Sequence, residues 1–89
     1  MSNVYENILT GLQEAIVPVK EYNSKEVKTI RNKTGLSQKL FAIYMGVSVK
    51  TVEAWETGTN RPNGAASRIL SMMELDNDLT KRFPFVQVE

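Results

Sequence analysis

Residues 36–58 decide the fold; they read LSQKLFAIYMGVSVKTVEAWETG. Ser37 and Ser48 are suitable helix N-caps, because a serine oxygen accepts a hydrogen bond from a free backbone N–H of the first turn. Gly46 and Gly58 follow the two helical runs at the points where the backbone leaves a helix with positive φ. The stretch therefore predicts two short helices, each ending just before its glycine, joined by a tight turn.

Small and apolar side chains occupy the positions that pack such a pair of helices together. Ala42 is small where the two helices cross, and Gly46 follows four residues later at the turn. Val47, Val52 and Trp55 supply the buried face of the second helix. No proline interrupts either helix. This agreement strongly indicates a bihelical unit of the kind that reads DNA.

The first 24 residues are predicted to form a helix and a linker. Apolar residues recur there with the 3.6-residue period of an α-helix. The apolar stripe consists of Ile8, Leu9, Leu12, Ala15 and Ile16. Pro18 ends this helix, and residues 17–23 follow as the linker.

The rest of the chain continues the helical pattern. Ser24 is the expected N-cap of a helix over 25–34, which Gly35 ends. A loop over 59–64 then leads to a helix over 65–75. The expected divisions are an N-terminal helix and linker over 1–24, a helical module over 25–75, and a C-terminal turn and tail over 76–89.

The composition excludes several classes of function. The 89 residues, at 10.0 kDa, fit one small domain. The chain has no Cys and no His, which excludes disulfides, the usual zinc sites and imidazole acid–base chemistry. Paired carboxylates on one face and a phosphate-binding glycine loop are also missing from the sequence, so neither an enzyme nor a bound metal or cofactor is expected. Without a signal-peptide pattern or an apolar run near the roughly 20 residues of a membrane span, a cytoplasmic protein is expected.

The net charge of +1 conceals an uneven distribution. Residues 25–70 hold eight bases and three acids, which gives this middle part a net charge of +5. The flanks, residues 1–24 and 71–89, each carry −2. The basic middle part suits a phosphate backbone, whereas the acidic flanks suit a basic partner.

Beyond the two helices, a spaced set of side chains extends over the module: Leu36, Ser37, Gln38, Phe41, Ala42, Gly46, Val47, Ser48, Thr51, Val52, Trp55, Glu56, Gly58, Pro62, Gly64, Ala66, Arg68, Ile69 and Leu70. This set resembles the Cro/phage-repressor-type (XRE) helix-turn-helix family over residues 25–75. The pieces Trp-Glu-x-Gly from residue 55 and Pro-x-Gly-x-Ala-x-Arg-Ile-Leu from residue 62 most resemble HigA-type antitoxins of bacterial toxin–antitoxin pairs. The resemblance implies an all-α, five-helix lambda-repressor-like DNA-binding domain with an extra N-terminal helix and a short extended C-terminal tail.

The resemblance also implies which residues meet DNA bases. The second helix of the unit would lie in the major groove. Its base-reading residues would be Ser48, Val49, Lys50, Thr51, Glu53 and Ala54. Lys50 would donate to guanine, and Val49 or Ala54 would pack on a thymine methyl group. Glu53 would accept from cytosine or point away from the phosphates. Because this helix is poor in amide and guanidinium side chains, DNA shape is expected to carry part of the specificity.

Other positions are expected to bind phosphates or to hold the unit together. The phosphate-binding residues implied by the resemblance are Gln38, Lys39, Asn60 and Arg61. The structural core of the motif would consist of Arg31, Phe41, Ala42, Gly46, Val47, Val52, Trp55, Glu56 and Gly58. Within it, Arg31 and Glu56 correspond to a family ion pair that fixes the helix angle. Arg68 reaches back to backbone carbonyls or faces a partner.

Apolar side chains outside the motif need cover. Leu40 and Ile43 are apolar where the family usually has polar residues, and with Tyr44 they form a patch. The N-terminal stripe, a dimer mate or another protein would cover it.

The C-terminal end leaves similar alternatives. Asp76 or Asp78 is expected to open a last helical turn through Arg82, before an irregular end over 83–89. The tail segment 85–88 would add as a strand to another chain or strap across the domain. Another apolar set suits either a dimer interface or the monomer core: Met72, Met73, Leu75, Leu79 and Phe83.

The expected function is a sequence-specific DNA-binding repressor that also serves as the antitoxin of a type II toxin–antitoxin pair. It would bind a palindromic operator as a homodimer, regulate its own operon, and hold a small basic toxin through its acidic flanks. The first alternative is a stand-alone phage or mobile-element regulator without a toxin. The second is a protein-interaction module that does not bind DNA. Such a protein would work in a bacterial cytoplasm, at the nucleoid.

Overall fold

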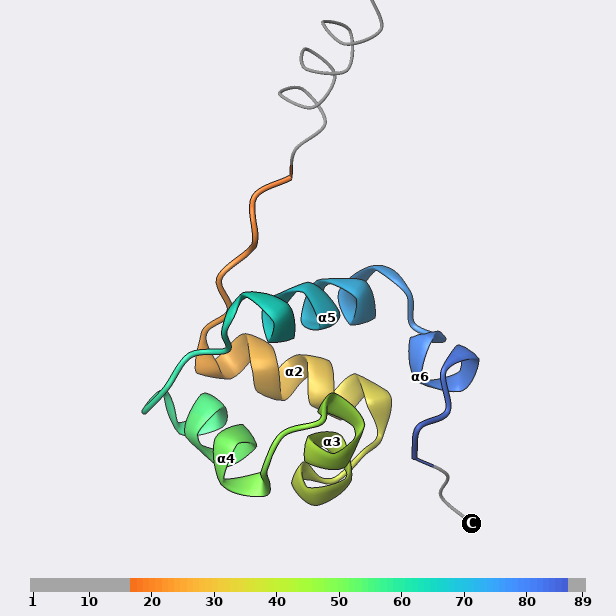
Figure 1. Cartoon of the computed structure of the whole chain (residues 1–89), viewed down its shortest axis with the longest axis horizontal. Helices are drawn as coiled ribbons and strands as arrows, with labels where there is room; N and C mark the ends of the chain where they lie inside the picture. The colour runs from red at the N-terminus through yellow and green to blue at the C-terminus, as the bar shows by residue number, and fades with distance from the viewer. Residues whose placement is uncertain (1–16, 87–89) are drawn as a thin grey trace, which may run out of the picture.

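The computed structural model describes residues 17–86, and within them the chain forms five α-helices and no strand (Figure 1). These helices are α2 (Ser24–Thr34), α3 (Gln38–Met45), α4 (Val49–Thr57), α5 (Gly64–Leu75) and α6 (Leu79–Arg82). The all-α, five-helix prediction is thereby confirmed. The predicted N-terminal helix, with its stripe from Ile8 to Ile16, and the tail residues 87–89 lie outside the described residues.

The two helices of the central unit begin and end where the sequence predicts. The Ser37 hydroxyl accepts from the Leu40 N–H at 3.2 Å and caps α3. Gly46, at φ +76°, ends α3, and Gly58, at φ +84°, ends α4. Because other residues reach this left-handed region only with strain, both glycines are needed for the tight turns that follow.

The N-cap of α2 and the first residue of α5 differ from the prediction by one residue. Asn23, not Ser24, is the N-cap of α2. Its side chain accepts from the Glu26 N–H at 2.8 Å, and the Glu26 carboxylate accepts from the Asn23 N–H at 3.0 Å. This reciprocal capping box satisfies two free donors, which a serine one position later cannot do. Asn63 caps α5 through a single bond, in which its side chain accepts from the Ala66 N–H at 2.9 Å, and α5 therefore starts at Gly64.

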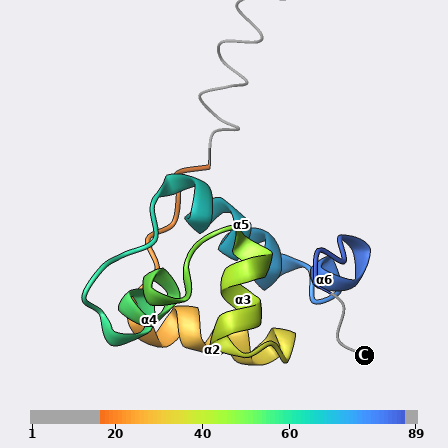
Figure 2. The same ribbon diagram turned by 60° about the horizontal axis from the view of Figure 1, so that its bottom comes forward.

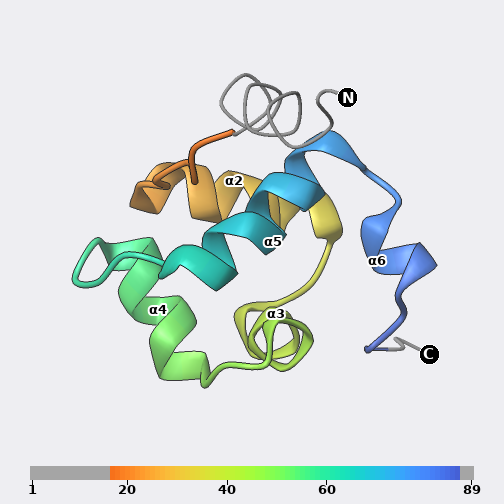
Figure 3. The same cartoon turned by 45° about the horizontal axis from the view of Figure 1, so that its top comes forward.

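The helices pack around one core, with α4 and α6 at opposite ends of the domain (Figures 1 and 3). Helix α4 packs on α2 and α3, α2 packs on α5, and α6 packs on α5. Figure 2 shows α4 and α6 on opposite sides in a third view. The buried core residues are Tyr22, Val27, Ile30, Leu36, Phe41, Ala42, Tyr44, Met45, Val52, Trp55, Ala66, Leu70, Met73 and Leu79.

The predicted linker is an anchored strap. Tyr22 within it is 1% exposed and belongs to the core. Its hydroxyl donates to Glu74 at 2.6 Å and lies 2.7 Å from the Ser71 hydroxyl. The hydrogen bond from Tyr22, and then the ammonium group of Lys20 at 3.3 Å, hold the pKa of Glu74 below its ordinary value. Residues 17–23 are thus fixed along α5.

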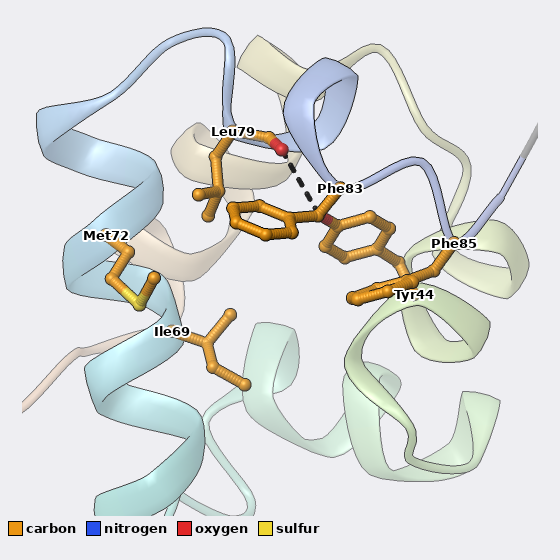
Figure 4. A pocket seen from close by; sticks show the side chains of 6 residues that line it. All are labelled: Tyr44, Ile69, Met72, Leu79, Phe83 and Phe85. Carbon is orange, nitrogen blue, oxygen red and sulfur yellow. Dashed lines mark hydrogen bonds between the residues drawn. The ribbon is translucent and has the colours of Figure 1, made fainter.

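Arg68 and Tyr44 show how the described segments before α2 and after α5 attach to the module. Arg68 donates to the Val17 carbonyl at 2.9 Å, which decides between its two predicted roles in favour of a backbone carbonyl. Tyr44 is buried, its ring lies 5.2 Å from that of Phe85, and its hydroxyl donates to the Leu79 carbonyl at 3.4 Å. The cover over Tyr44 in the described residues therefore comes from the C-terminal segment (Figure 4), which was predicted as a possible strap across the domain but not as the cover of this patch. Ile43 stays 54% exposed.

The C-terminal apolar residues differ in burial. Met73 and Leu79 are buried in the monomer core. Met72, Leu75 and Phe83 remain exposed. The monomer-core role is therefore confirmed for Met73 and Leu79, and the dimer-interface role stays a prediction for the other three.

Candidate nucleic-acid interface

Helix α4 has one buried face and one exposed face. Val52 and Trp55 point into the core and are 0% and 4% exposed. Val49, Lys50 and Glu53 are exposed, and the two other predicted readers on this helix, at positions 51 and 54, are half-buried. The period of the helix puts these side chains on the surface that the core leaves open. Five of the six predicted base-reading residues thus lie along one short helix.

The sixth predicted base reader, Ser48, holds the start of α4. Its Oγ accepts from the Thr51 N–H at 3.1 Å and lies 2.9 Å from Thr51 Oγ1. The two hydroxyls thus satisfy one another and cap the helix. The predicted N-cap role of Ser48 is confirmed, whereas the bond between its hydroxyl and that of Thr51 was not predicted.

A network of charged and amide groups joins α2, α3 and α4. Arg31 Nε donates to Glu56 Oε2 at 2.6 Å, and Arg31 Nη2 donates to Oε1 at 3.1 Å. A third donor, Gln38 Nε2, reaches Oε1 at 3.0 Å. Arg31 Nη1 also donates to the Leu36 carbonyl at 3.0 Å. The predicted ion pair is present, and it forms part of a larger network that links α4 to α2 and α3.

Burial and ion pairing act in opposite directions on the Glu56 carboxylate. Its side chain is 4% exposed, against 14% for Arg31. Burial raises the pKa of Glu56. The hydrogen bonds from Arg31 and Gln38 and the nearby positive charges lower this pKa by more than burial raises it. The net pKa lies below its ordinary value, so Glu56 carries its charge at neutral pH.

The four predicted phosphate-binding residues lie at the start of α3 and after α4. Gln38 uses one N–H of its amide for Glu56, which the sequence prediction missed. Lys39 is exposed, and Asn60 is held by its backbone N–H, which donates to the Ala54 carbonyl at 3.2 Å. Arg61 donates to Glu21 at 2.9 Å, with both side chains largely exposed. Such an exposed ion pair is weak, so a phosphate can replace Glu21.

Neither a metal-binding cluster nor a membrane-spanning helix occurs in the described part of the chain. Residues 17–86 contain no group of three or more His, Cys, Asp or Glu side chains placed to hold a metal ion. Among the helices of the same residues, none has the length and apolar character needed to cross a membrane.

The comparison with protein families assigns a known domain to this region. A family model described as Helix-turn-helix matches residues 27–71, which is half of the chain. The match runs from α2 into α5 and includes the whole of α3 and α4. The chain has no match among curated proteins.

Proposed function

The chain belongs to the helix-turn-helix family, and from this we propose that it is a sequence-specific transcriptional repressor that places α4 in the major groove of DNA. A DNA-binding domain of this family is typical of transcriptional regulators. The observation that carries the proposal is the exposed face of α4, whose opposite face is fixed by Trp55 and by the network around Glu56. A rigid helix with an exposed polar face suits the major groove, which is about 12 Å wide.

The proposal gives Lys50 the most specific role. Its exposed ammonium group lies in the first turn of α4, which is the part of a recognition helix that meets base edges. It donates to guanine O6 or N7, and Val49 or Ala54 packs on a thymine methyl group. Glu53 accepts from cytosine N4 one turn further along. Ser48 and Thr51 keep the helix start in shape and contact bases through their exposed atoms.

Affinity without sequence information comes from the phosphate contacts. We propose these contacts for two residues at the start of α3 and two that follow α4, namely Gln38, Lys39, Asn60 and Arg61. The amide of Gln38 has a second N–H beside the one that Glu56 accepts, and this N–H is the proposed phosphate donor. The lysine and arginine contacts release counterions, so binding weakens as the salt concentration rises.

Lys50→Ala and Arg61→Ala are expected to weaken DNA binding in different ways. A preferred site is first selected from random DNA with the full chain. Lys50→Ala should lose about 1–3 kcal/mol on that site and little on unrelated DNA, because it removes a base contact. Arg61→Ala should weaken both DNAs alike and flatten the salt dependence, because it removes a phosphate contact. Fluorescence anisotropy titrations at several salt concentrations measure both effects.

Thr29→Ala on α2 is the matched control, because Thr29 is exposed and its hydroxyl bonds only its own helix. Its affinity should equal that of the wild-type chain. If Lys50→Ala and Arg61→Ala gave equal losses on every DNA, Lys50 would not be a base reader. If the wild-type chain selected no sequence at all, the repressor proposal would be wrong.

We further propose that the chain binds a palindromic operator as a homodimer and acts as the antitoxin of a type II toxin–antitoxin pair. The residue pieces around Trp55 and Pro62 that resemble HigA-type antitoxins support this role, as do the acidic flanks. The product of a neighbouring gene should then co-purify with the chain, and the chain should relieve the growth arrest that this product causes. Neighbouring genes without a small toxic product would instead favour a stand-alone phage or mobile-element regulator.

A further inference from the structure

One acidic side chain of the strap, residues 17–23, faces a proposed phosphate contact. Arg61 Nη1 donates to Glu21 Oε1 at 2.9 Å, and the two residues are 40 positions apart in the sequence. The strap and the loop that leads into α5 lie side by side at the start of that helix (Figure 1), where residues of both segments line one cleft. A carboxylate of the acidic N-terminal flank thus reaches into the basic middle part of the chain.

The chain is fixed on both sides of Glu21. Tyr22, which follows it, is 1% exposed and donates to the Glu74 carboxylate at 2.6 Å. Lys20, which precedes it, lies 3.3 Å from the same carboxylate. Because these contacts already hold the backbone, only the Glu21 side chain remains to be ordered when its carboxylate meets Arg61.

The backbone around Arg61 is held as well. The N–H of Asn60 donates to the Ala54 carbonyl at 3.2 Å, and Pro62 has a fixed φ. Exposed ion pairs gain little free energy, partly because two long side chains lose their freedom. The pair of Glu21 and Arg61 orders these two side chains and no further segment, which favours the upper part of that small range.

A carboxylate and a DNA phosphate compete for the same guanidinium group. Both offer negatively charged oxygen atoms, and Arg61 binds either through its N–H groups. The two acceptors repel one another, so a phosphate that approaches Arg61 drives Glu21 away. The exchange needs no change of the fold, because the Arg61 side chain is 68% exposed and that of Glu21 is 81% exposed. Breaking the pair therefore weakens any phosphate contact that Arg61 makes.

We propose that Glu21 is an intramolecular competitor of DNA for Arg61 and lowers the affinity of the domain for DNA. This role rests on the proposed function, because it requires Arg61 to be a phosphate contact. The strap then does more than pack Tyr22 into the core, since it holds a negative charge where DNA would place one. A phosphate contact carries no sequence information, so Glu21 lowers the affinity for preferred and unrelated DNA by the same factor.

Glu21→Gln is expected to raise the affinity about two- to fivefold on the selected site and on unrelated DNA alike. The amide keeps the shape of the side chain and removes the charge that holds Arg61. Fluorescence anisotropy of the full chain measures both affinities in about 0.15 M salt, where exposed charges more than about 8 Å apart are largely screened. Asp78→Asn is the matched control, because Asp78 is exposed at the start of α6, at the other end of the domain from α4, and loses the same charge. Its affinity should equal that of the wild-type chain.

The Arg61→Ala background separates competition for Arg61 from a general effect of charge. Without the guanidinium group, the Glu21 carboxylate has no cation to withhold from DNA, so the gain from Glu21→Gln should largely disappear. An equal gain with and without Arg61 would overturn the inference, because Glu21 would then act on DNA through its charge alone. An unchanged affinity of Glu21→Gln in the presence of Arg61 would overturn it as well.

Heparin, a sulfated polyanion, tests the competition without DNA. From a heparin column, Glu21→Gln should elute at a higher salt concentration than the wild-type chain, whereas Arg61→Ala and the double variant should elute together. If Arg61→Ala weakens DNA binding and Glu21→Gln changes neither DNA binding nor elution, the inference alone fails. If the wild-type chain selects no DNA sequence, the proposed function fails, and the elution of these variants still decides whether Glu21 competes with polyanions for Arg61.

Discussion

Trp55→Ala should destabilise the domain by about 3–5 kcal/mol, as expected for the removal of a buried aromatic side chain. Trp55 is 4% exposed and lies in the core where α4 packs on α2 and α3. A small domain has only about 5–15 kcal/mol of stability, so the melting temperature should fall by about 15–30 °C. Because Trp55 is the only tryptophan, unfolding is measured by circular dichroism in urea rather than by fluorescence.

Two variants separate core packing from the surface of the same helix. Trp55→Phe keeps an aromatic side chain in the site and should lose less than about 2 kcal/mol. Lys50→Ala, on the exposed face, should change the stability by less than about 0.5 kcal/mol. A loss below about 1 kcal/mol for Trp55→Ala would mean that Trp55 does not hold α4 in place.

The helix ends of the central unit could be predicted because their causes are local. A glycine after a short apolar-periodic run leaves the helix with positive φ, and a serine before it caps the first turn. Gly46 and Gly58 therefore mark real helix ends. The N-cap of α2 could also have been predicted locally, since Asn23 and Glu26 have the spacing of a capping box. The prediction of Ser24 did not take into account Glu26, which lies three residues after Asn23 and completes the capping box.

The attachment of the segments before α2 and after α5 could not be predicted because its causes are long-range. Tyr22 looks like one aromatic residue in a polar linker until Ser71 and Glu74, about 50 residues away, lie beside it. The burial of Tyr44 likewise depends on Phe85 and on the Leu79 carbonyl. No periodicity in the sequence connects these positions, so only the packed fold reveals them.

The exposed helix face of the candidate site could be predicted, but the hydrogen bonds of its polar side chains could not. The exposed positions of α4 follow from the burial of Val52 and Trp55, which the apolar pattern already indicates. The partners of polar side chains depend on the angles between helices. Gln38 was predicted as a phosphate contact, yet its nearest partner is Glu56, 18 residues away on another helix. The network thus links the proposed phosphate contact to the helix that it helps to orient.

Two carboxylates, Glu56 in the network and Glu74 beside Tyr22, should make the domain less stable at acidic pH. The pKa values of Glu56 and Glu74 are both below the ordinary value of 4.5 in the folded chain. An acid of this kind contributes stability above its unfolded pKa, and the contribution is lost as the pH falls through the folded pKa. The free energy of unfolding should therefore be constant near neutral pH and decrease below about pH 4.5. In a variant without Glu56, the free energy of unfolding should decrease less at acidic pH, and the remaining decrease should come from Glu74.

Glu56→Ala should destabilise the domain by about 2–4 kcal/mol at pH 7, because Arg31 and Gln38 lose their common acceptor at a site with little access to water. This loss of stability is smaller than that expected for a fully buried pair, because Arg31 is 14% exposed and still donates a hydrogen bond to the Leu36 carbonyl. Arg31→Met should lose at least as much, since it leaves the Glu56 carboxylate buried with only the Gln38 amide.

The double variant Arg31→Met/Glu56→Leu decides whether the pair acts as a unit. Two apolar side chains leave no charge without a partner, so the double variant should lose clearly less than the two single variants together. Urea unfolding at pH 7 and at pH 3.5 measures the coupling, which should shrink at the lower pH, because the folded chain lowers the pKa of Glu56 and the unfolded chain then binds the proton more readily. DNA affinity of the double variant is a separate readout, because Gln38 then lacks its acceptor and α4 its fixed angle. Additive single losses at both pH values would show that Arg31 and Glu56 contribute independently and that their contact does not position α4.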